Sequence, residues 1–252
     1  VACDFSYVFN IVVSSRSSQR LYASTRTGVF RSNDGGTSWA KLIDGGPVNG
    51  CHDIVMQTRR AVGYVFVACG TFAQATIHRA LDSAASSFAP VFSTANMGRT
   101  SLAIAPSNES YVYAMSASTA GGNYNNGLLG VFRSTANGNP GSWTTQVSNT
   151  NSKKLNTLLL TNPVYGFLAD CGFGSSNQFY NQGWYDNVLA VDPADPNVVW
   201  AGGIDLFRSD DGGANWGLAS YWWFTQGSDL QYAHADQHVI KFHPGYNGTT
   251  NK

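Results

Sequence analysis

The sequence predicts an all-β protein, organised as a β-propeller of four-stranded antiparallel blades. The first observation behind this prediction is a stretch that recurs along the chain. Residues 28–39 read Gly-Val-Phe-Arg-Ser-Asn-Asp-Gly-Gly-Thr-Ser-Trp, and residues 205–216 read Asp-Leu-Phe-Arg-Ser-Asp-Asp-Gly-Gly-Ala-Asn-Trp. A degenerate copy with an insertion covers 130–143, and a poorer copy covers 76–82. Where the spacing is regular it is about 50 residues, which is typical of a propeller blade.

The second observation is the composition. The chain has 27 glycines, and Gly, Asn, Ser and Thr separate short apolar runs, a pattern typical of an all-β protein with many turns. Charged residues make up 12% of the 252 residues and the formal net charge is zero, which argues against binding nucleic acid through its phosphates. No apolar run reaches the length of a membrane span.

The third observation is the order of strands and turns inside each repeat. Apolar strands and turn residues predict blades at about 9–44, 52–92, 100–147 and 186–218. Residues 148–185 fit this order poorly and are expected to form an insertion. Residues 232–252 are expected to open a further blade, with residues 232–244 as its inner strand. Closed propellers typically have 4–8 whole blades, so four blades and one further strand do not make a regular closed propeller. Either the last strand completes an earlier sheet as a closing clasp, or the chain is part of a longer protein and its propeller is incomplete; we expect the second.

The repeated stretch predicts a hairpin whose turn is held by one aspartate and one tryptophan. Aspartate can accept hydrogen bonds from backbone amides ahead of it, and glycine adopts positive φ easily. The pattern resembles the Asp-box of bacterial neuraminidase (BNR) repeats, Ser-x-Asp-x-Gly-x-Thr-Trp. The matching residues are Ser32, Asp34, Gly36 and Trp39 in one copy, and Ser209, Asp211, Gly213 and Trp216 in the other. The resemblance implies a structural role for these residues, at the outer part of a blade and away from the central site.

The four cysteines predict one disulfide bond. Cys51 and Cys69 flank a polar turn and lie at equal distances from residue 60, so they would face each other across a simple hairpin. The alternative is two buried free thiols. Cys3 and Cys171 can pair or stay free. A disulfide, together with low charge and many Asn and Thr residues, favours an exported, extracellular or cell-surface protein.

A histidine-rich stretch near the end of the chain is a candidate metal site. If residues 232–244 form a strand, His234, Asp236 and His238 point to one face, since side chains alternate along a strand. Three such side chains could bind a divalent metal, which is the one cofactor that the sequence suggests. The alternative is a hydrogen-bonded polar cluster that fixes the strand in the channel.

Two aspartates are candidate catalytic residues. Asp186 and Asp236 would occupy equivalent places at the starts of neighbouring inner strands, where ligands reach the channel mouth of a propeller. Two carboxylates several ångströms apart suit an acid and a base, or an acid and a nucleophile, on either side of a glycosidic bond. Nearby aromatic residues could stack on sugar rings: Trp184, Tyr185, Trp222 and Trp223. Alternatively, the aspartates cap loop amides and the aromatic residues pack the rim.

Relatives that share the Asp-box narrow the choice of function. Sialidases need a Tyr–Glu nucleophile pair, but Glu109 is the only glutamate here and lies in a turn, and the chain lacks the Arg-Ile-Pro start. Xyloglucanase-type propellers use two aspartates, and sortilin-like ectodomains bind peptides without catalysis. More closely, 183–187, 203–213 and 234–238 are similar to a group of large exported bacterial BNR-repeat proteins without an assigned activity.

We therefore expect an exported propeller that acts as a binding or structural module without catalysis. Its partner would be a glycan or a protein at the channel mouth, or further copies of itself in an assembly. The alternative is a glycoside hydrolase that acts on a polysaccharide through Asp186 and Asp236. The two readings differ in whether these carboxylates converge in an open cleft beside stacking aromatic residues.

Overall fold

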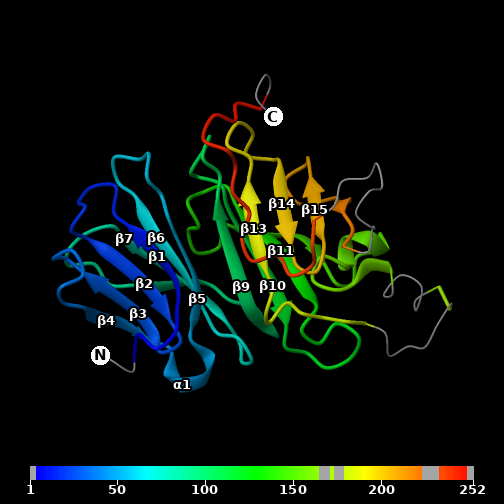
Figure 1. Ribbon diagram of the computed structural model, residues 1–252, viewed down its shortest axis with the longest axis horizontal. Helices are drawn as coiled ribbons and strands as arrows, with labels where there is room; N and C mark the ends of the chain where they lie inside the picture. The colour runs from blue at the N-terminus through cyan, green and yellow to red at the C-terminus, as the bar shows by residue number, and fades with distance from the viewer. Residues whose placement is uncertain (1–3, 165–170, 173–178, 223–232, 249–252) are drawn as a thin grey trace.

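The computed structural model describes residues 4–164, 171–172, 179–222 and 233–248 and is nearly all β (Figure 1). It contains four separate four-stranded sheets, each antiparallel and each in chain order. A short helix, α1 (Gly46–Asn49), and a 3-10 turn, η1 (Lys154–Thr157), lie between sheets. Within the described ranges, no helix has the length and apolar character needed to cross a membrane.

The sheets confirm the predicted four-stranded antiparallel blades. Sheet 1 consists of β1 (Val8–Val13), β2 (Leu21–Thr25), β3 (Gly28–Ser32) and β4 (Ala40–Asp44). Sheet 2 consists of β5 (Cys51–Met56), β6 (Tyr64–Cys69), β7 (Thr76–Leu81) and β8 (Ala89–Phe92). Sheet 3 consists of β9 (Met97–Ile104), β10 (Val112–Ser118), β11 (Leu128–Ser134) and β12 (Trp143–Ser148). Sheet 4 consists of β13 (Val188–Val191), β14 (Val199–Gly202), β15 (Leu206–Ser209) and β16 (Gly217–Ser220).

The first strand of each sheet faces the interior of the molecule. β1 contacts β5, β5 contacts β9, and β9 contacts β13, so the inner strands lie next to one another in chain order. The other strands of each sheet fan outward from this row, as Figure 1 shows. A row of inner strands with sheets packed face to face is the arrangement of propeller blades, and it places the starts of the inner strands around one central space.

Three apolar cores fill the spaces between neighbouring sheets. Tyr22 and Ile54 lie in the core between sheets 1 and 2, and Phe66 lies in the core between sheets 2 and 3. Met115 and Phe207 lie in the core between sheets 3 and 4. All five side chains are fully buried, and burying a side chain of this size contributes about 1.5–3 kcal/mol to folding. Each sheet is thereby held mainly by its neighbours.

The outer turn of sheet 1 is held by its serine, aspartate and tryptophan. Ser32 Oγ accepts a hydrogen bond from the Gly36 amide at 2.8 Å, and Asp34 Oδ1 accepts one from the Ser38 amide at 2.9 Å. Trp39 Nε1 donates to the Gly36 carbonyl at 3.0 Å. Gly36 has a φ of 94°, a conformation that side-chain-bearing residues rarely adopt. The turn is thus fixed by hydrogen bonds within itself.

The outer turn of sheet 4 repeats this arrangement. Ser209 Oγ accepts from the Gly213 amide at 2.9 Å, and Asp211 Oδ1 accepts from the Asn215 amide at 2.9 Å. Trp216 Nε1 donates to the Gly213 carbonyl at 2.9 Å. The same residues at the same spacing therefore give the same turn, although the two turns lie far apart in the sequence.

The degenerate copy in sheet 3 keeps only part of the arrangement. Ser134 Oγ still accepts from the Gly138 amide at 3.0 Å. No aspartate follows the serine, and the indole Nε1 of Trp143 is buried without a hydrogen-bond partner in the described structure. The serine and glycine positions are sufficient to close this turn, while the aspartate and the tryptophan N–H add bonds only in the complete copies.

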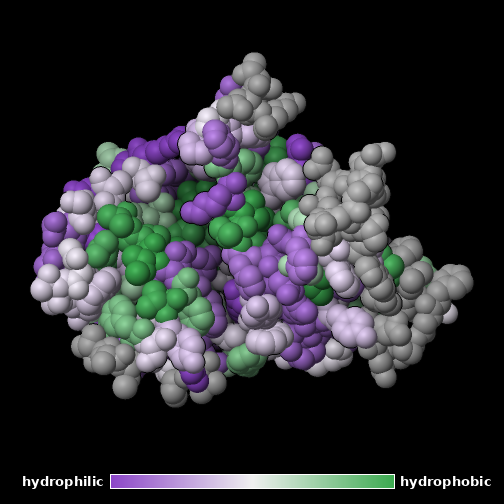
Figure 2. Space-filling model, viewed as in Figure 1, coloured by the Kyte–Doolittle hydropathy of each residue, from purple (hydrophilic) through white to green (hydrophobic). Residues whose placement is uncertain are grey.

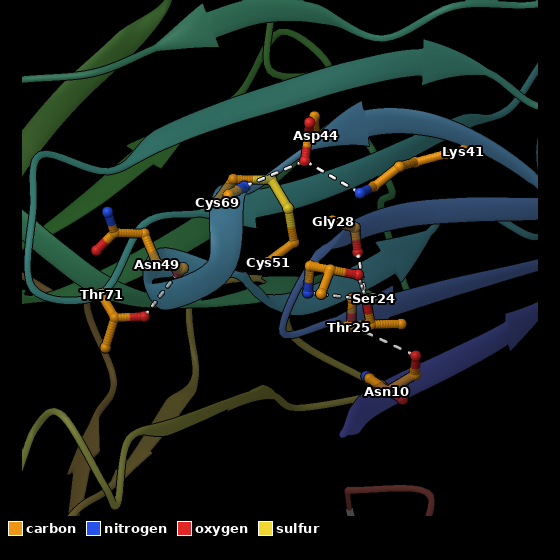
Figure 3. The surroundings of a disulfide bond; sticks show 12 residues. Asn10, Ser24, Thr25, Gly28, Lys41, Asp44, Asn49, Cys51, Cys69 and Thr71 are labelled. Carbon is orange, nitrogen blue, oxygen red and sulfur yellow. Dashed lines mark hydrogen bonds and ion pairs between the residues drawn. A yellow bond between two sulfur atoms is a disulfide. The ribbon is translucent and has the colours of Figure 1, made fainter. Parts of the chain in front are cut away.

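A disulfide bond joins the first two strands of sheet 2. Cys51 and Cys69 are paired in register between β5 and β6, and their sulfur atoms are bonded. Figure 3 shows the bond beside α1, where the Thr71 hydroxyl donates to the Asn49 carbonyl at 2.9 Å. Cys171 is an exposed free thiol. Cys3 lies outside the described residues, so the pairing suggested for it stays an expectation.

Two segments differ from the sequence-based expectation. Within the expected insertion 148–185, Leu158, Leu159 and Leu160 are buried without forming a strand, and Leu159 and Leu160 belong to the core of sheets 3 and 4. The inner strand expected to open a further blade is also absent, because 233–248 contains no strand. Asp236 has a φ of 69°, which interrupts an extended conformation, and the backbone of Gln237 bonds instead to the Gly203 carbonyl at 2.8 Å.

Candidate functional site

A groove of about 870 Å³ lies along the inner strands. Residues from β1, β5, β9 and β13 line it, and residues 238–241 form part of its wall. Figure 2 shows apolar side chains over β1 and around the hollow between the sheets. All four sheets thus contribute to one site, as expected for the central space of a propeller, and its volume is that of a ligand site rather than of a packing defect.

Exposed aromatic rings line one side of the groove. Trp184 and Tyr185 immediately precede β13, and their exposed fractions are 44% and 45%. Their ring centroids lie 5.6 Å apart, and the Trp184 ring lies 6.2 Å from that of Phe72. His238 packs edge-on against Tyr185 at 4.8 Å. These rings form a half-exposed apolar platform, which can accept the flat face of a ligand.

Arg99 holds this platform in place. It lies in β9, and its Nη1 donates to the Trp184 carbonyl at 2.8 Å and also to the Tyr185 carbonyl. The Arg99 guanidinium is therefore fixed at the groove wall, directly beside the two aromatic residues. Burial lowers the pKa of Arg99, and the charges of Asp53 and Asp186 partly oppose this. Arginine stays protonated in proteins, so the groove keeps a positive charge here.

Asp53 is a carboxylate on the groove wall, and the backbone holds it. Its Oδ2 accepts from the Leu102 amide at 2.7 Å, and its Oδ1 accepts from Asn10 Nδ2 at 3.2 Å. Burial raises the pKa of Asp53, and these hydrogen bonds partly offset the rise. The Asp53 carboxylate thus links β1, β5 and β9, and most of its hydrogen-bonding capacity is used in doing so.

The structure brings Asp186 and Asp236 together. The amide of Gln182, oriented with its nitrogen toward both carboxylates, donates to Asp236 Oδ1 at 2.8 Å and to Asp186 Oδ2 at 2.9 Å. Because one nitrogen contacts both, these oxygens lie within about 6 Å of each other. The loop before β13 positions the pair, since the Asp186 amide donates to the Gln182 carbonyl at 2.9 Å.

Burial, reinforced by the charge of Asp236, raises the pKa of Asp186 to about 8. Two close carboxylates cannot easily both ionise, so the pair retains a proton at neutral pH. A carboxyl group that stays protonated at neutral pH can act as a general acid. However, the Asp186 side chain is fully buried, and neither aspartate lines the groove. In this conformation the pair cannot contact a ligand bound in the groove.

The metal site expected at His234, Asp236 and His238 is not formed. The prediction required a strand that points these side chains to one face, but the segment is not a strand and Asp236 has positive φ. His238 turns to Tyr185, and His234 Nδ1 contacts the Ala235 carbonyl. In the part of the chain that the structure describes, no three His, Cys, Asp or Glu side chains come together as a possible metal site.

The four aromatic residues expected to stack on sugars separate into two groups. Trp184 and Tyr185 line the groove, whereas Trp222 does not. The Trp222 amide donates to Asp205 Oδ1 at 2.7 Å, which ties it to the turn between β14 and β15 instead. Trp223 lies outside the described residues. Of the three aromatic residues that the structure describes, the two that directly precede an inner strand, Trp184 and Tyr185, lie at the groove.

Four residues at the site were not singled out from the sequence: Asp53, Phe72, Arg99 and Gln182. Arg99 and Asp53 lie near the starts of inner strands, so the rule that led to Asp186 would also have found them. Phe72 follows β6, and Gln182 lies in a loop without strands. Nothing in the local sequence pattern distinguishes these two from ordinary loop residues, because only packing brings them to the site.

No family model matches the chain, and no curated protein sequence matches it. Solved structures do match. A GH74 enzyme from Niastella koreensis matches with a TM-score of 0.54 and 16% identity over 83% of this chain and 30% of that one. A GH74 xyloglucanase from Xanthomonas campestris matches with 0.53 and 14% over 84% and 30%. An ancestral GH74 enzyme matches with 0.51 and 20% over 83% and 23%.

These similarities support the fold alone. At such identities they show that the four sheets are blades of a β-propeller, in agreement with the prediction from the repeats. The chain spans less than a third of the length of each neighbour. The activity of those whole proteins is therefore a matter for proposal in this chain.

Proposed function

We propose that this chain is an exported β-propeller module that binds a glycan in the groove along its inner strands. The observation that carries the proposal is the platform of Trp184, Tyr185 and Phe72, whose rings are half exposed on the wall of a groove of about 870 Å³. An apolar ring with a polar group beside it suits a sugar, which has an apolar face and a hydroxylated edge.

Several features of the groove support binding without catalysis. Arg99 fixes the aromatic platform from behind through the Trp184 and Tyr185 carbonyls, so the platform is preorganised. The Asp53 carboxylate already accepts hydrogen bonds from the Leu102 amide and from Asn10, so it is not available as a catalytic group. The outer turns, which we assign to the Asp-box type, stabilise the sheets at a distance from the groove.

Binding to soluble polysaccharides tests this function. Affinity electrophoresis or calorimetry with a panel of neutral and acidic polysaccharides should show retention of the full chain. Trp184→Ala should weaken the affinity about tenfold, since buried aromatic contacts at binding sites commonly contribute more than 1 kcal/mol. Trp200→Ala is the matched control, because Trp200 packs against Arg208 in sheet 4 and does not line the groove.

Failure to retain the chain on every polysaccharide in the panel would contradict the proposal. Equal losses for Trp184→Ala and Trp200→Ala would contradict the location of the site. Both variants are first compared with the parent chain by circular dichroism and thermal unfolding, so that a loss of affinity can be assigned to the groove and not to misfolding.

Glycoside hydrolysis is the second candidate, favoured by one observation. Asp186 and Asp236 share the Gln182 amide, and the pKa of Asp186 is raised to about 8, as for a general acid. The complete burial of Asp186 opposes this role. Release of reducing sugars from xyloglucan that disappears in Asp186→Asn and in Asp236→Asn would favour hydrolysis. Unchanged release in both variants, or no release, would exclude this pair as the catalytic residues.

A further inference from the structure

The charges on the groove wall are unbalanced. Among the described residues that line it, Arg26, Arg99 and Lys241 carry positive charge, whereas Asp53 is the one carboxylate. The whole chain has a formal net charge of zero, so the groove is more positive than the molecule that contains it. His52 also lines the groove, but burial lowers its pKa to about 3 and it stays neutral at physiological pH.

Two of these cations form no ion pair with a side chain that the structure describes. Within the described residues, no carboxylate lies within ion-pair distance of Arg99 or Lys241. Arg99 donates to backbone carbonyls, and Lys241 is exposed in the part of the groove wall formed by residues 238–241. Asp186 and Asp236 do not line the groove, and burial raises the pKa of Asp186 to about 8, so this carboxyl group stays protonated at neutral pH. An unbalanced positive groove raises the local concentration of anions.

One of these cations lies next to the aromatic platform. Arg99 is hydrogen-bonded to the Trp184 and Tyr185 carbonyls, so its guanidinium lies next to the backbone that carries the two rings. A ligand that stacks on these rings therefore brings its substituents near a guanidinium, whose planar geometry suits carboxylates and sulfate groups. A neutral sugar would use the platform but would leave these charges unpaired.

We infer that the glycan bound in this groove is acidic, with carboxylate or sulfate groups that pair with Arg99 and Lys241 while its rings lie on Trp184 and Tyr185. This inference rests on the proposed glycan-binding function and specifies its ligand class. The sugar rings supply the stacking surface, and the anionic groups supply the charge that the groove lacks.

Three polymers of matched backbone or charge test the ligand class with the full chain. Polygalacturonate carries carboxylates, dextran sulfate carries sulfate esters, and unmodified dextran is neutral. At low salt we expect at least one acidic polymer to bind about tenfold more tightly than dextran, a difference that shrinks as salt is raised to 0.5 M because screening weakens exposed charge pairs. Which acidic polymer binds more tightly identifies the anionic group.

Lys241→Gln is the decisive variant, since Lys241 is exposed and forms no ion pair with the described residues. It should lower the affinity for the acidic polymer about threefold to fivefold, the effect of one exposed charge pair, and leave thermal stability unchanged. Lys153→Gln is the matched control, because Lys153 is exposed directly before η1, contacts Asn215 and does not line the groove. Arg99→Lys retains the charge and tests whether the planar fork is needed.

The outcomes separate this inference from the proposed function. If dextran and the acidic polymers bind equally and without salt dependence, glycan binding stands and the acidic ligand class is overturned. If no polymer binds, the proposed function itself fails. If single-stranded DNA binds as tightly as the acidic polysaccharides, the groove selects charge alone and the inference of a glycan is overturned.

Discussion

Aspartate side chains have opposite surroundings in two regions of the molecule: the outer turns, and the inner rim, by which we mean the loop before β13 that carries Asp186. On the outer turn of sheet 1, hydrogen bonds from the Ser38 hydroxyl and amide and from Ser32 lower the pKa of Asp34 to about 2. At the rim, burial and the neighbouring Asp236 raise the pKa of Asp186 to about 8. The comparison teaches that donors lower the pKa of an exposed aspartate in a turn, whereas burial, reinforced by a neighbouring carboxylate, raises the pKa of an aspartate with fewer donors.

The two regions should therefore respond to pH in opposite directions. A carboxyl group with a lowered folded-state pKa stabilises the fold above its unfolded pKa, and this stabilisation is lost as pH falls. A carboxyl group with a raised folded-state pKa destabilises the fold progressively as pH rises from about 4, its unfolded value, to its folded value. Acid should weaken the outer turns, and mild alkali should weaken the rim.

The largest expected effect is on the rim. Asp186→Asn removes the buried ionisable group, so we expect the variant to be more stable than the parent by about 4 kcal/mol at pH 8.5 and by much less at pH 5. Urea unfolding at both pH values measures the difference. Asp210→Asn is the control, since Asp210 is exposed and pairs with Arg208. A variant whose stability keeps the parent's pH dependence would contradict the raised pKa of Asp186.

The next effect concerns the disulfide bond between β5 and β6 of sheet 2. Replacing both Cys51 and Cys69 by alanine opens a covalent loop with a sequence separation of 18 residues, and should lower the free energy of unfolding by about 3 kcal/mol. The measurement is chemical unfolding under non-reducing conditions. Cys171→Ala should have no such effect, because Cys171 is an exposed free thiol. Equal stability of the double variant and the parent would show that β5 and β6 need no covalent link.

A smaller effect is expected on the outer turn of sheet 4. Asp211 accepts hydrogen bonds from the Ala214 and Asn215 amides, at 3.1 Å and 2.9 Å. Asp211→Ala should cost about 1–2 kcal/mol at neutral pH, and the loss should shrink as pH falls from about 4 through the lowered folded-state pKa of Asp211, where the parent carboxylate protonates too. Asp210→Ala, one residue earlier, should cost far less. A loss that persists in acid would mean that the side chain acts through packing.

The smallest effect separates the complete turns from the degenerate one. Trp216→Phe loses a hydrogen bond to the Gly213 carbonyl, whereas the Trp143 N–H has no partner in the described structure. Trp143→Phe should therefore cost about 0.5–1 kcal/mol less than Trp216→Phe, the net contribution of one hydrogen bond. Thermal unfolding of the two variants compares them. Equal costs would show that ring packing, not the N–H, matters in these turns.

The sequence was informative wherever a structure depends on a few neighbouring residues. The outer turns at 32–39 and 209–216 close through bonds among residues within the turn, so their pattern predicted their geometry. Cys51 and Cys69 lie at equal distances from the turn of one hairpin, so the sequence predicted that they face each other. The inner strand expected at 232–244 is the counterexample, because Asp236 in a left-handed conformation interrupts the apparent strand in the described residues 233–244. Alternating residues alone did not reveal this.

The site was only partly predictable for the same reason. Asp186, Trp184 and Tyr185 adjoin the start of an inner strand, so their approach to the central space could be expected. Asp236 reaches Asp186 by another route, since it lies on an irregular segment held by the Gln237 amide. The metal site expected at 234–238 depended on that missing strand and is absent from the described structure.

By itself, the sequence determined the all-β class, the four-stranded blades and the hydrogen-bonded outer turns, because each depends on contacts between residues close in the chain. The tertiary structure alone decided that Asp186 is buried, that Gln182 joins it to Asp236, and that Arg99 lies behind the Trp184 and Tyr185 platform. Burial, charge proximity and the shape of the groove arise where distant segments meet, and no local pattern of residues encodes the distances between them.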